Sequence, residues 1–141
     1  MFTGVYSINI AVNDCEIAVK KFKDVLNIEP KYFRDEDFAF PNLMGAQFFL
    51  GGVALNVIGS KTDDTSIAQF VKKQGEGLFL VSLLVDDIER DVKAMKEKGC
   101  KFVTEIKEVP LGKVTFAHPK SFHGVQLEIL QLYKANPVIK E

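Results

Sequence analysis

Two stretches of the chain repeat one pattern, in which alternating apolar and polar residues are followed by apolar residues at helical spacing. They are SINIAVNDCEIAVKKFKDVL, residues 7–26, and LVSLLVDDIERDVKAMKEKG, residues 80–99. Alternation is typical of a half-buried strand, and spacing of three or four residues is typical of an amphipathic helix. At the junctions, Asp14 and Asp87 can accept hydrogen bonds from the free N–H groups of a helix start. The pattern therefore predicts two strand–helix units, the second ending at Gly99.

The two units are also similar in sequence, which indicates an internal repeat. At an offset of 73 residues six positions are identical: Val12 and Val85, Asp14 and Asp87, Glu16 and Glu89, Val19 and Val92, Lys20 and Lys93, and Lys23 and Lys96.

Three short strand candidates with glycine punctuation follow each predicted helix. They cover residues 31–40, 45–51 and 52–59 in the first half, and 100–106, 112–118 and 124–132 in the second. Each half therefore has the order βαβββ. The polar linker between the halves predicts a short helix from Ser66 to about Lys73, capped by Thr65 or Ser66.

These elements predict an α+β fold in which two βαβββ modules form a curved eight-stranded mixed sheet, or open barrel, around a cavity. We place the first module at residues 1–60, the linker at 61–76 and the second module at 77–135, all within one domain, 1–135. Residues 136–141 are expected to form a C-terminal tail.

Alternation along the strands assigns side chains to the two faces of the sheet. It predicts that Tyr6 and Ile8 face a helix, as do Phe79 and Val81 in the repeat. The opposite face then collects polar side chains from four strands: Ser7, Asn9, Asn56, Ser82, Gln126 and Glu128. If the sheet encloses a cavity, these residues lie on its floor, where a ligand would bind.

Composition narrows the classes of partner. The net charge of −1 and the pI of about 6.1 give no electrostatic attraction for nucleic acid or an anionic membrane. The first ten residues lack the pattern of a secretion signal, and no apolar run approaches the roughly 20 residues of a membrane span. Cys15 and Cys100 lack metal-ligand spacing and are expected to be reduced thiols in a cytoplasmic protein.

Three stretches carry a resemblance to a known family: SINIAVND near the start, SIAQFVKKQGEGLFLVSLLVDDIERDVKAMKEKG in the middle and FAHPKSFHGVQLEIL near the end. The sequence resembles the vicinal oxygen chelate superfamily, the relatives of glyoxalase, bleomycin resistance proteins and dioxygenases. Within it the chain is most similar to methylmalonyl-CoA epimerase-like proteins. The resemblance implies paired βαβββ modules that surround a ligand site.

The resemblance also implies a place for a divalent metal ion, with one ligand from each of four strands. The epimerase pattern has His at the position of Ser7, Gln or Glu at Asn56, His at Leu80 and Glu at Glu128. Only Glu128 matches this pattern. Transition metal ions favour imidazole and carboxylate ligands, so we expect neither a metal ion at this place nor another cofactor.

A second departure concerns the carboxylate that epimerases carry before their third strand. The corresponding stretch here, FAFPNLMG, has no acid between Phe38 and Gly45. Glu36 and Asp37 lie just upstream and could replace it only if the loop is rearranged. Epimerisation needs a base, an acid on the other face and stabilisation of the enolate. We therefore expect the fold to carry over without the epimerase reaction.

Two functions remain open from the sequence. The favoured one is a metal-independent binder of a small organic molecule; the alternative is a metal-independent isomerase or lyase acting on an enolisable substrate such as an acyl-CoA. In the alternative, Glu128 is the base and Asn9, Asn56 or Gln126 stabilises the oxyanion. Glu128 could instead be a relic held by hydrogen bonds to polar neighbours.

Further candidates come from the loop before the last strand and from a group of aromatic residues. His118, Lys120 and Ser121 are expected to lie at the cavity mouth and contact the ligand. The aromatic group forms either core and dimer packing or a wall of the cavity; it comprises Phe38, Phe40, Phe48 and Phe49. We expect the chain to form a homodimer.

Overall fold

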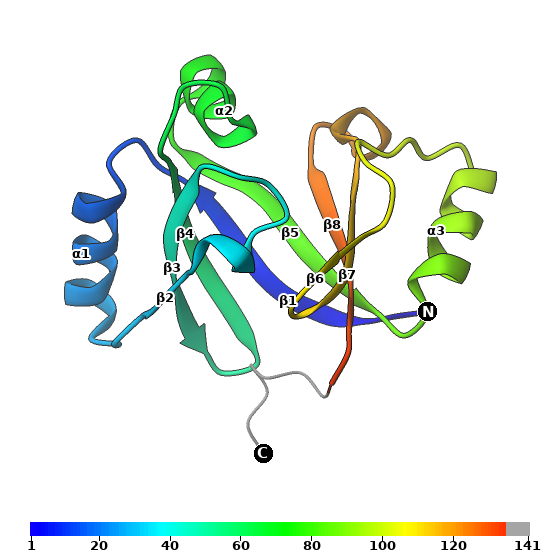
Figure 1. The fold of residues 1–141 in the computed structure, drawn as a ribbon, viewed down its shortest axis with the longest axis horizontal. Coiled ribbons are helices and arrows are strands. Elements are labelled where there is room, and N and C mark those ends of the chain that lie inside the picture. The colour runs from blue at the N-terminus through cyan, green and yellow to red at the C-terminus, as the bar shows by residue number, and fades with distance from the viewer. Residues whose placement is uncertain (135–141) are drawn as a thin grey trace.

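The structure is a computed structural model that describes residues 1–134, so the expected tail at 136–141 lies outside the described residues. Eight strands form one strongly curved sheet in the order β2-β3-β4-β1-β5-β8-β7-β6 (Figure 1). The strands are β1 Phe2–Ala11, β2 Lys31–Tyr32, β3 Leu43–Leu50, β4 Val53–Ser60, β5 Gly77–Val85, β6 Lys107–Val109, β7 Gly112–Ala117 and β8 Gln126–Leu132. The helices are α1 Cys15–Leu26, α2 Ser66–Gln74 and α3 Ile88–Glu97, with short 3-10 turns η1 Asp35–Asp37 and η2 Pro119–Phe122.

The strand pairing repeats in the two halves of the sheet. β1 is parallel to β4, and β5 is parallel to β8. The halves join where β1 pairs antiparallel with β5 of the same chain. This arrangement confirms the predicted α+β fold of eight mixed strands curved around a cavity. The exact module boundaries, at residues 60 and 77, stay a prediction.

The predicted helix caps are confirmed. Asp14 accepts a hydrogen bond from the backbone N–H of Ile17 at 3.1 Å, and Asp87 accepts one from that of Arg90 at 3.1 Å. Thr65, one of the two residues predicted to cap the linker helix, accepts from the N–H of Ala68 at 3.1 Å. α1 packs on β3 and β4, and α3 packs on β8, on the outer side of the curved sheet (Figure 1).

The strand predicted at residues 31–40 is wrong beyond Tyr32. The backbone N–H of Arg34 donates to the Asp37 carboxylate at 2.8 Å, which closes the turn η1 and ends the strand. The chain from there to residue 42 then crosses in front of the concave face of the sheet (Figure 1).

The strand predicted at 100–106 is also wrong, since only one isolated bridge, between Phe102 and Ala117, forms there. The Thr115 hydroxyl donates to the carbonyl oxygen of Thr104 at 2.8 Å, so at this point a side chain of β7 replaces its backbone as the hydrogen-bond partner of the segment. The edge strand β6 begins only at Lys107.

Two irregularities in the β1–β5 pairing correct the face assignment. The register shifts between Val5 and Ser7, and Tyr6 consequently packs inside the curved sheet beside Ser7. The register shifts again between Asn9 and Ile10, whose partners on β5 are Leu80 and Leu78. Phe79 lies between these two partners, lines the cavity and packs against α2. Both residues were predicted to face the outer helices. Alternation fails here because each bulge adds one unpaired residue to a strand.

Hydrophobic clusters on both sides hold the sheet in its curved shape. One lies between α1 and the β3–β4 pair and includes Val19 and Phe48. Another lies under α3 and includes Val92 and Ile129. A third cluster fills part of the concave side and leaves the polar floor of the sheet open beside it. No helix among residues 1–134 is long and apolar enough to cross a membrane.

Candidate functional site

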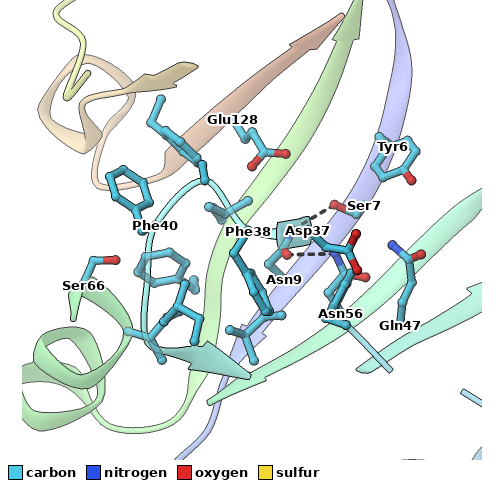
Figure 2. Close-up of a pocket in the computed structure, with 18 of the residues that line it drawn as sticks. Tyr6, Ser7, Asn9, Asp37, Phe38, Phe40, Gln47, Asn56, Ser66 and Glu128 are labelled. Atoms are coloured by element: carbon cyan, nitrogen blue, oxygen red, sulfur yellow. Dashed lines mark hydrogen bonds between the residues drawn. The ribbon is translucent and has the colours of Figure 1, made fainter. Parts of the chain in front are cut away.

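A cavity of about 180 Å³ lies on the concave face of the sheet, between the polar floor, the loop that contains η1, and α2 (Figure 2). It is smaller than the several hundred Å³ of a pocket for a drug-sized ligand, so it suits a small molecule or one group of a larger one. Five residues predicted from the sequence line it: Ser7, Asn9, Asn56, Gln126 and Glu128.

The other predicted residues lie elsewhere. Ser82 is fully buried beneath the floor, and its hydroxyl donates to the Glu128 carboxyl group at 2.7 Å. His118, Lys120 and Ser121 are not among the residues that line the cavity. Ser121 instead accepts from the backbone N–H of Lys101 at 3.0 Å, at the turn η2. A ligand-binding role for these residues stays a prediction.

Glu128 is the titratable group of the floor. Its side chain is partly accessible because it faces the cavity, but the surrounding protein separates it from bulk water. This burial raises the pKa of Glu128 above its ordinary value, and the hydrogen bond from Ser82 opposes the rise only in part. Glu128 can therefore hold a proton at a pH where an exposed glutamate has lost it.

A chain of side-chain hydrogen bonds crosses the floor (Figure 2). The Asn56 amide donates to the Asn9 carbonyl oxygen at 2.9 Å, and the Asn9 amide donates to the Ser7 hydroxyl at 2.9 Å. The Asn56 carbonyl oxygen is buried and has no hydrogen-bond partner among the described residues. A buried acceptor without a partner is unfavourable, which makes this atom a candidate contact for a ligand.

Sequence reasoning missed four polar residues that line the cavity, namely Tyr6, Lys31, Gln47 and Ser66, and it considered Asp37, which also lines the cavity, only for the case of a rearranged loop. The η1 turn holds Asp37 over the floor, where Arg34 pairs with its carboxylate at 3.3 Å. Gln47 lies on β3 opposite Asn56. It is the only polar residue of its strand, and this signal could have revealed it. Tyr6 and Asp37 depend on a bulge and a turn that no residue pattern specified.

Tyr6 lies among the polar groups of the cavity. Burial is the main cause that raises its pKa, a hydrogen bond with Gln47 opposes this, and the negative charges of Glu128 and Asp37 add to the rise. The phenol is therefore a neutral hydrogen-bonding group near two carboxyl groups that come from different parts of the chain.

Aromatic side chains line the cavity beside and above the polar floor. Phe40 packs against Phe116 with ring centres 5.4 Å apart, and Phe33 packs against Phe38 at 5.1 Å. All four line the cavity. Phe48 is instead fully buried under α1, so the aromatic residues near β3 divide between wall and core.

The four positions at which the resemblance implies metal ligands, Ser7, Asn56, Leu80 and Glu128, all line the cavity. Leu80 carries no donor atom, and the Ser7 oxygen already accepts from Asn9. The set offers one carboxyl group, whose pKa is raised, and no imidazole. These residues do not fit a transition metal ion.

Paired βαβββ halves that enclose a cavity inside one curved sheet define a fold class built from a duplicated unit. The model of the Glyoxalase/Bleomycin resistance protein/Dioxygenase superfamily matches residues 7–133, and the chain belongs to this family. A search of curated protein sequences found no match.

Solved structures with the same fold include several methylmalonyl-CoA epimerases. One, in complex with methylmalonyl-CoA and NH4+, has a TM-score of 0.84 at 20% identity and covers 96% of this chain and 99% of its own. The epimerase of Mycobacterium tuberculosis has a TM-score of 0.80 at 21% identity, with 94% and 90% covered. A hypothetical protein of Bacillus halodurans has a TM-score of 0.82 at 23% identity, with 92% and 94% covered. These similarities confirm the predicted fold.

Proposed function

We propose that this chain binds a small organic molecule in the concave cavity without a metal ion. The observation that carries the proposal is the composition of the floor, where hydrogen-bonding side chains surround a position, Leu80, that cannot bind metal. Aromatic rings beside and above the floor would exclude water from the ligand. The unpartnered oxygen of Asn56 supplies a polar contact that only a ligand or water would satisfy.

Native mass spectrometry of the protein purified from its own cells tests this proposal. We expect the folded protein to carry a small organic mass that is released on denaturation, and to carry no stoichiometric transition metal. Replacement of Phe40 by Ala should reduce the bound fraction because it opens the aromatic wall. One zinc, manganese, cobalt or nickel ion per chain would contradict the metal-free binding.

A second candidate function is proton transfer on an enolisable acyl-CoA-like substrate, and the place of the Glu128 carboxyl group in the cavity favours it. The solved epimerases of this fold include one with methylmalonyl-CoA bound, which motivates the substrate class. Ionised Glu128 would remove the proton from the carbon beside the thioester carbonyl. An amide of Gln126, Asn9 or Asn56 would donate to the enolate oxygen, and the Glu128 carboxyl group, which then carries the proton, would return it to the carbon.

Proton exchange in deuterated water separates this second function from simple binding. With methylmalonyl-CoA, the enzyme would replace the proton beside the thioester by deuterium, as followed by NMR. Glu128→Gln should slow the exchange by about 100-fold or more and leave binding in place. The control is Glu36→Gln, since Glu36 is an exposed acid next to Asp37. Exchange that is unchanged in Glu128→Gln would contradict the role of Glu128.

We also propose that the chain forms a homodimer through the outer face of the β1–β5 pair, as the expected assembly of a cytoplasmic protein. This face supports the proposal because Val5, Ile8 and Leu78 lie on it with 39%, 37% and 54% of their surface exposed. The helices α1 and α3 pack mainly on other strands, α1 on β3 and β4 and α3 on β8. Exposed apolar surface of this kind is often an interface.

A further inference from the structure

Four carboxamide side chains lie in one row across the floor of the cavity. Gln47 is paired with Asn56, Asn56 with Asn9, Asn9 with Leu80, and Leu80 with Gln126 in the register of adjacent strands. We call Gln47, Asn56, Asn9 and Gln126 the amide row. It crosses β3, β4, β1, β5 and β8, and all four residues line the cavity.

The amide row has hydrogen-bonding capacity that the protein leaves unused. Asn9 is satisfied at both ends of its amide, but the carbonyl oxygen of Asn56 has no partner among the described residues. Asn56 is 6% exposed and Gln47 beside it is 5% exposed, so a ligand that binds here displaces any water next to this oxygen. A ligand group beside Asn56 must therefore supply a donor.

The orientation of the two asparagine amides decides whether the ligand must supply a donor or an acceptor beside Asn56, and in either orientation it must supply one of them. If both were turned over, Ser7 would donate to Asn9 and Asn9 to Asn56, and the Asn56 N–H group would be the atom without a partner. A ligand edge that carries an N–H donor next to a carbonyl acceptor satisfies either arrangement. It also complements the neighbouring amide of Gln47, which offers a donor and an acceptor of its own.

The charges around the cavity favour a neutral ligand. Arg34 already neutralises Asp37, and burial favours the protonated form of Glu128. Among the described residues that line the cavity, Lys31 is the only cation; it is exposed on the edge strand β2 and is paired with Gln47 at one end of the amide row. An anion at the other end of the row, beside Asn9 and Gln126, would meet no opposite charge. The faces of Phe38, Phe40 and Phe116 favour a flat ring over a branched chain.

We infer that the cavity takes a flat, uncharged ring compound whose edge presents an N–H group next to a carbonyl, that is, a lactam, imide or cyclic urea, held by the amide row. This inference rests on the small-molecule binding proposed above and names its ligand class. It also distinguishes the site from one that holds a carboxylate.

The test uses three compounds with one ring: uracil, which has the N–H and carbonyl edge, dimethyluracil, which has lost both N–H donors, and orotate, which adds a carboxylate. Their affinities for the full-length protein are measured by NMR titration. We expect uracil to bind at least about tenfold more tightly than either of the other two, because each of these leaves a buried polar atom unpaired or buries a charge.

Variants locate the binding at the amide row. Asn56→Leu should reduce the affinity for uracil by about tenfold and leave that for dimethyluracil unchanged. Gln47→Leu gives the same test should Asn56→Leu fail to fold. Gln74→Leu, which removes an exposed amide at the end of α2, is the control and should change nothing.

The outcomes separate this inference from the proposed function. Equal binding of the three compounds, or tighter binding of orotate, overturns the ligand class and leaves small-molecule binding in place. Uracil affinity that persists in both amide-row variants overturns the role of the row. Absence of binding by all three compounds overturns the ligand class as well, and the mass spectrometry described above then decides separately whether the cavity holds any other molecule.

Discussion

Glu128 places a carboxyl group on a floor that is otherwise made of hydroxyls, amides and apolar side chains. Its ionisation is opposed by burial and helped only by the hydroxyl of Ser82. The folded protein therefore holds the Glu128 proton more tightly than the unfolded chain does. By linkage, this residue stabilises the fold while it is protonated, and the stabilisation is lost as pH rises.

Because the two pKa values of Glu128 differ, we predict that the free energy of unfolding depends on pH. Above the unfolded pKa of about 4.5, the free energy of unfolding should fall with pH until Glu128 ionises in the folded state. Each pH unit in this window costs up to about 1.4 kcal/mol. Urea denaturation at several pH values should show this slope in the wild type but not in Glu128→Gln. A difference between the two proteins that stays constant with pH would contradict the prediction.

Glu89 is the matched control for this measurement because its pKa shift has the opposite sign. A hydrogen bond from Lys113 lowers the pKa of Glu89. Glu89 therefore contributes stability above its unfolded pKa, and this contribution is lost as pH falls. Glu89→Gln should therefore change the free energy of unfolding with the opposite dependence on pH from Glu128→Gln. If both variants show the same dependence, the effect comes from the loss of any carboxylate and is not specific to Glu128.

Residues of the cavity floor could be predicted from the sequence wherever their strand is regular. Ser7, Asn56 and Glu128 follow strand alternation, so their side chains could be assigned to one face in advance. Tyr6 and Asp37 could not be, because a bulge turns the first inward and a side-chain hydrogen bond folds the second over the cavity. Such features depend on contacts that one sequence does not reveal by its pattern.

At the scale of elements, the repeat and its helix caps were predictable because they depend on local chemistry, as Asp14 and Asp87 demonstrate. The edges of the sheet were not. The segments at 31–40 and 100–106 carry apolar and β-branched residues, but they have a neighbouring strand on one side only. Side chains such as Thr115 then compete successfully with the regular backbone ladder.

β3 contains a glycine that the packing between strands requires. A Cβ atom added at Gly45 would lie 2.2 Å from the carbonyl oxygen of Val57 on β4, which is far inside contact distance. We predict that Gly45→Ala lowers the free energy of unfolding by about 1–3 kcal/mol, because the strand must shift to relieve the overlap. Chemical denaturation measures the change.

Gly4→Ala is the control for this prediction. Gly4 lies on β1, and a Cβ atom added there would meet no atom within 4 Å. Its stability should stay within about 0.5 kcal/mol of the wild type. Equal stability of the two variants would mean that β3 can move away from β4 at little cost.

At the scale of the whole molecule, the two outer helices pack on the wings of the sheet and leave the outer side of its central strands to apolar residues. If two copies meet there, Ile8→Lys places a charge in the interface of each protomer. We predict that this variant sediments as a monomer at concentrations where the wild type is a dimer, because a buried lysine without a partner opposes association.

Val25→Lys provides the comparison, since Val25 is equally apolar and 68% exposed but lies on α1. It should leave the dimer intact. A monomeric wild type, or a dimer that tolerates Ile8→Lys, would place the contact elsewhere or remove it.

The pairing of β1 with β5 also has a consequence for how the chain is made. Partners across this seam, from Ala11 with Gly77 to Phe2 with Val85, are 66 to 83 residues apart. At the usual speed of a ribosome, roughly 5–20 residues per second, β1 is synthesised about 3–17 s before its partner. During this interval the first half can pair β1 only with β4, and the other edge of β1 stays open to strands of neighbouring nascent chains. Translation pauses between residues 60 and 85 would prolong this exposure and favour aggregation before the cavity has a complete floor.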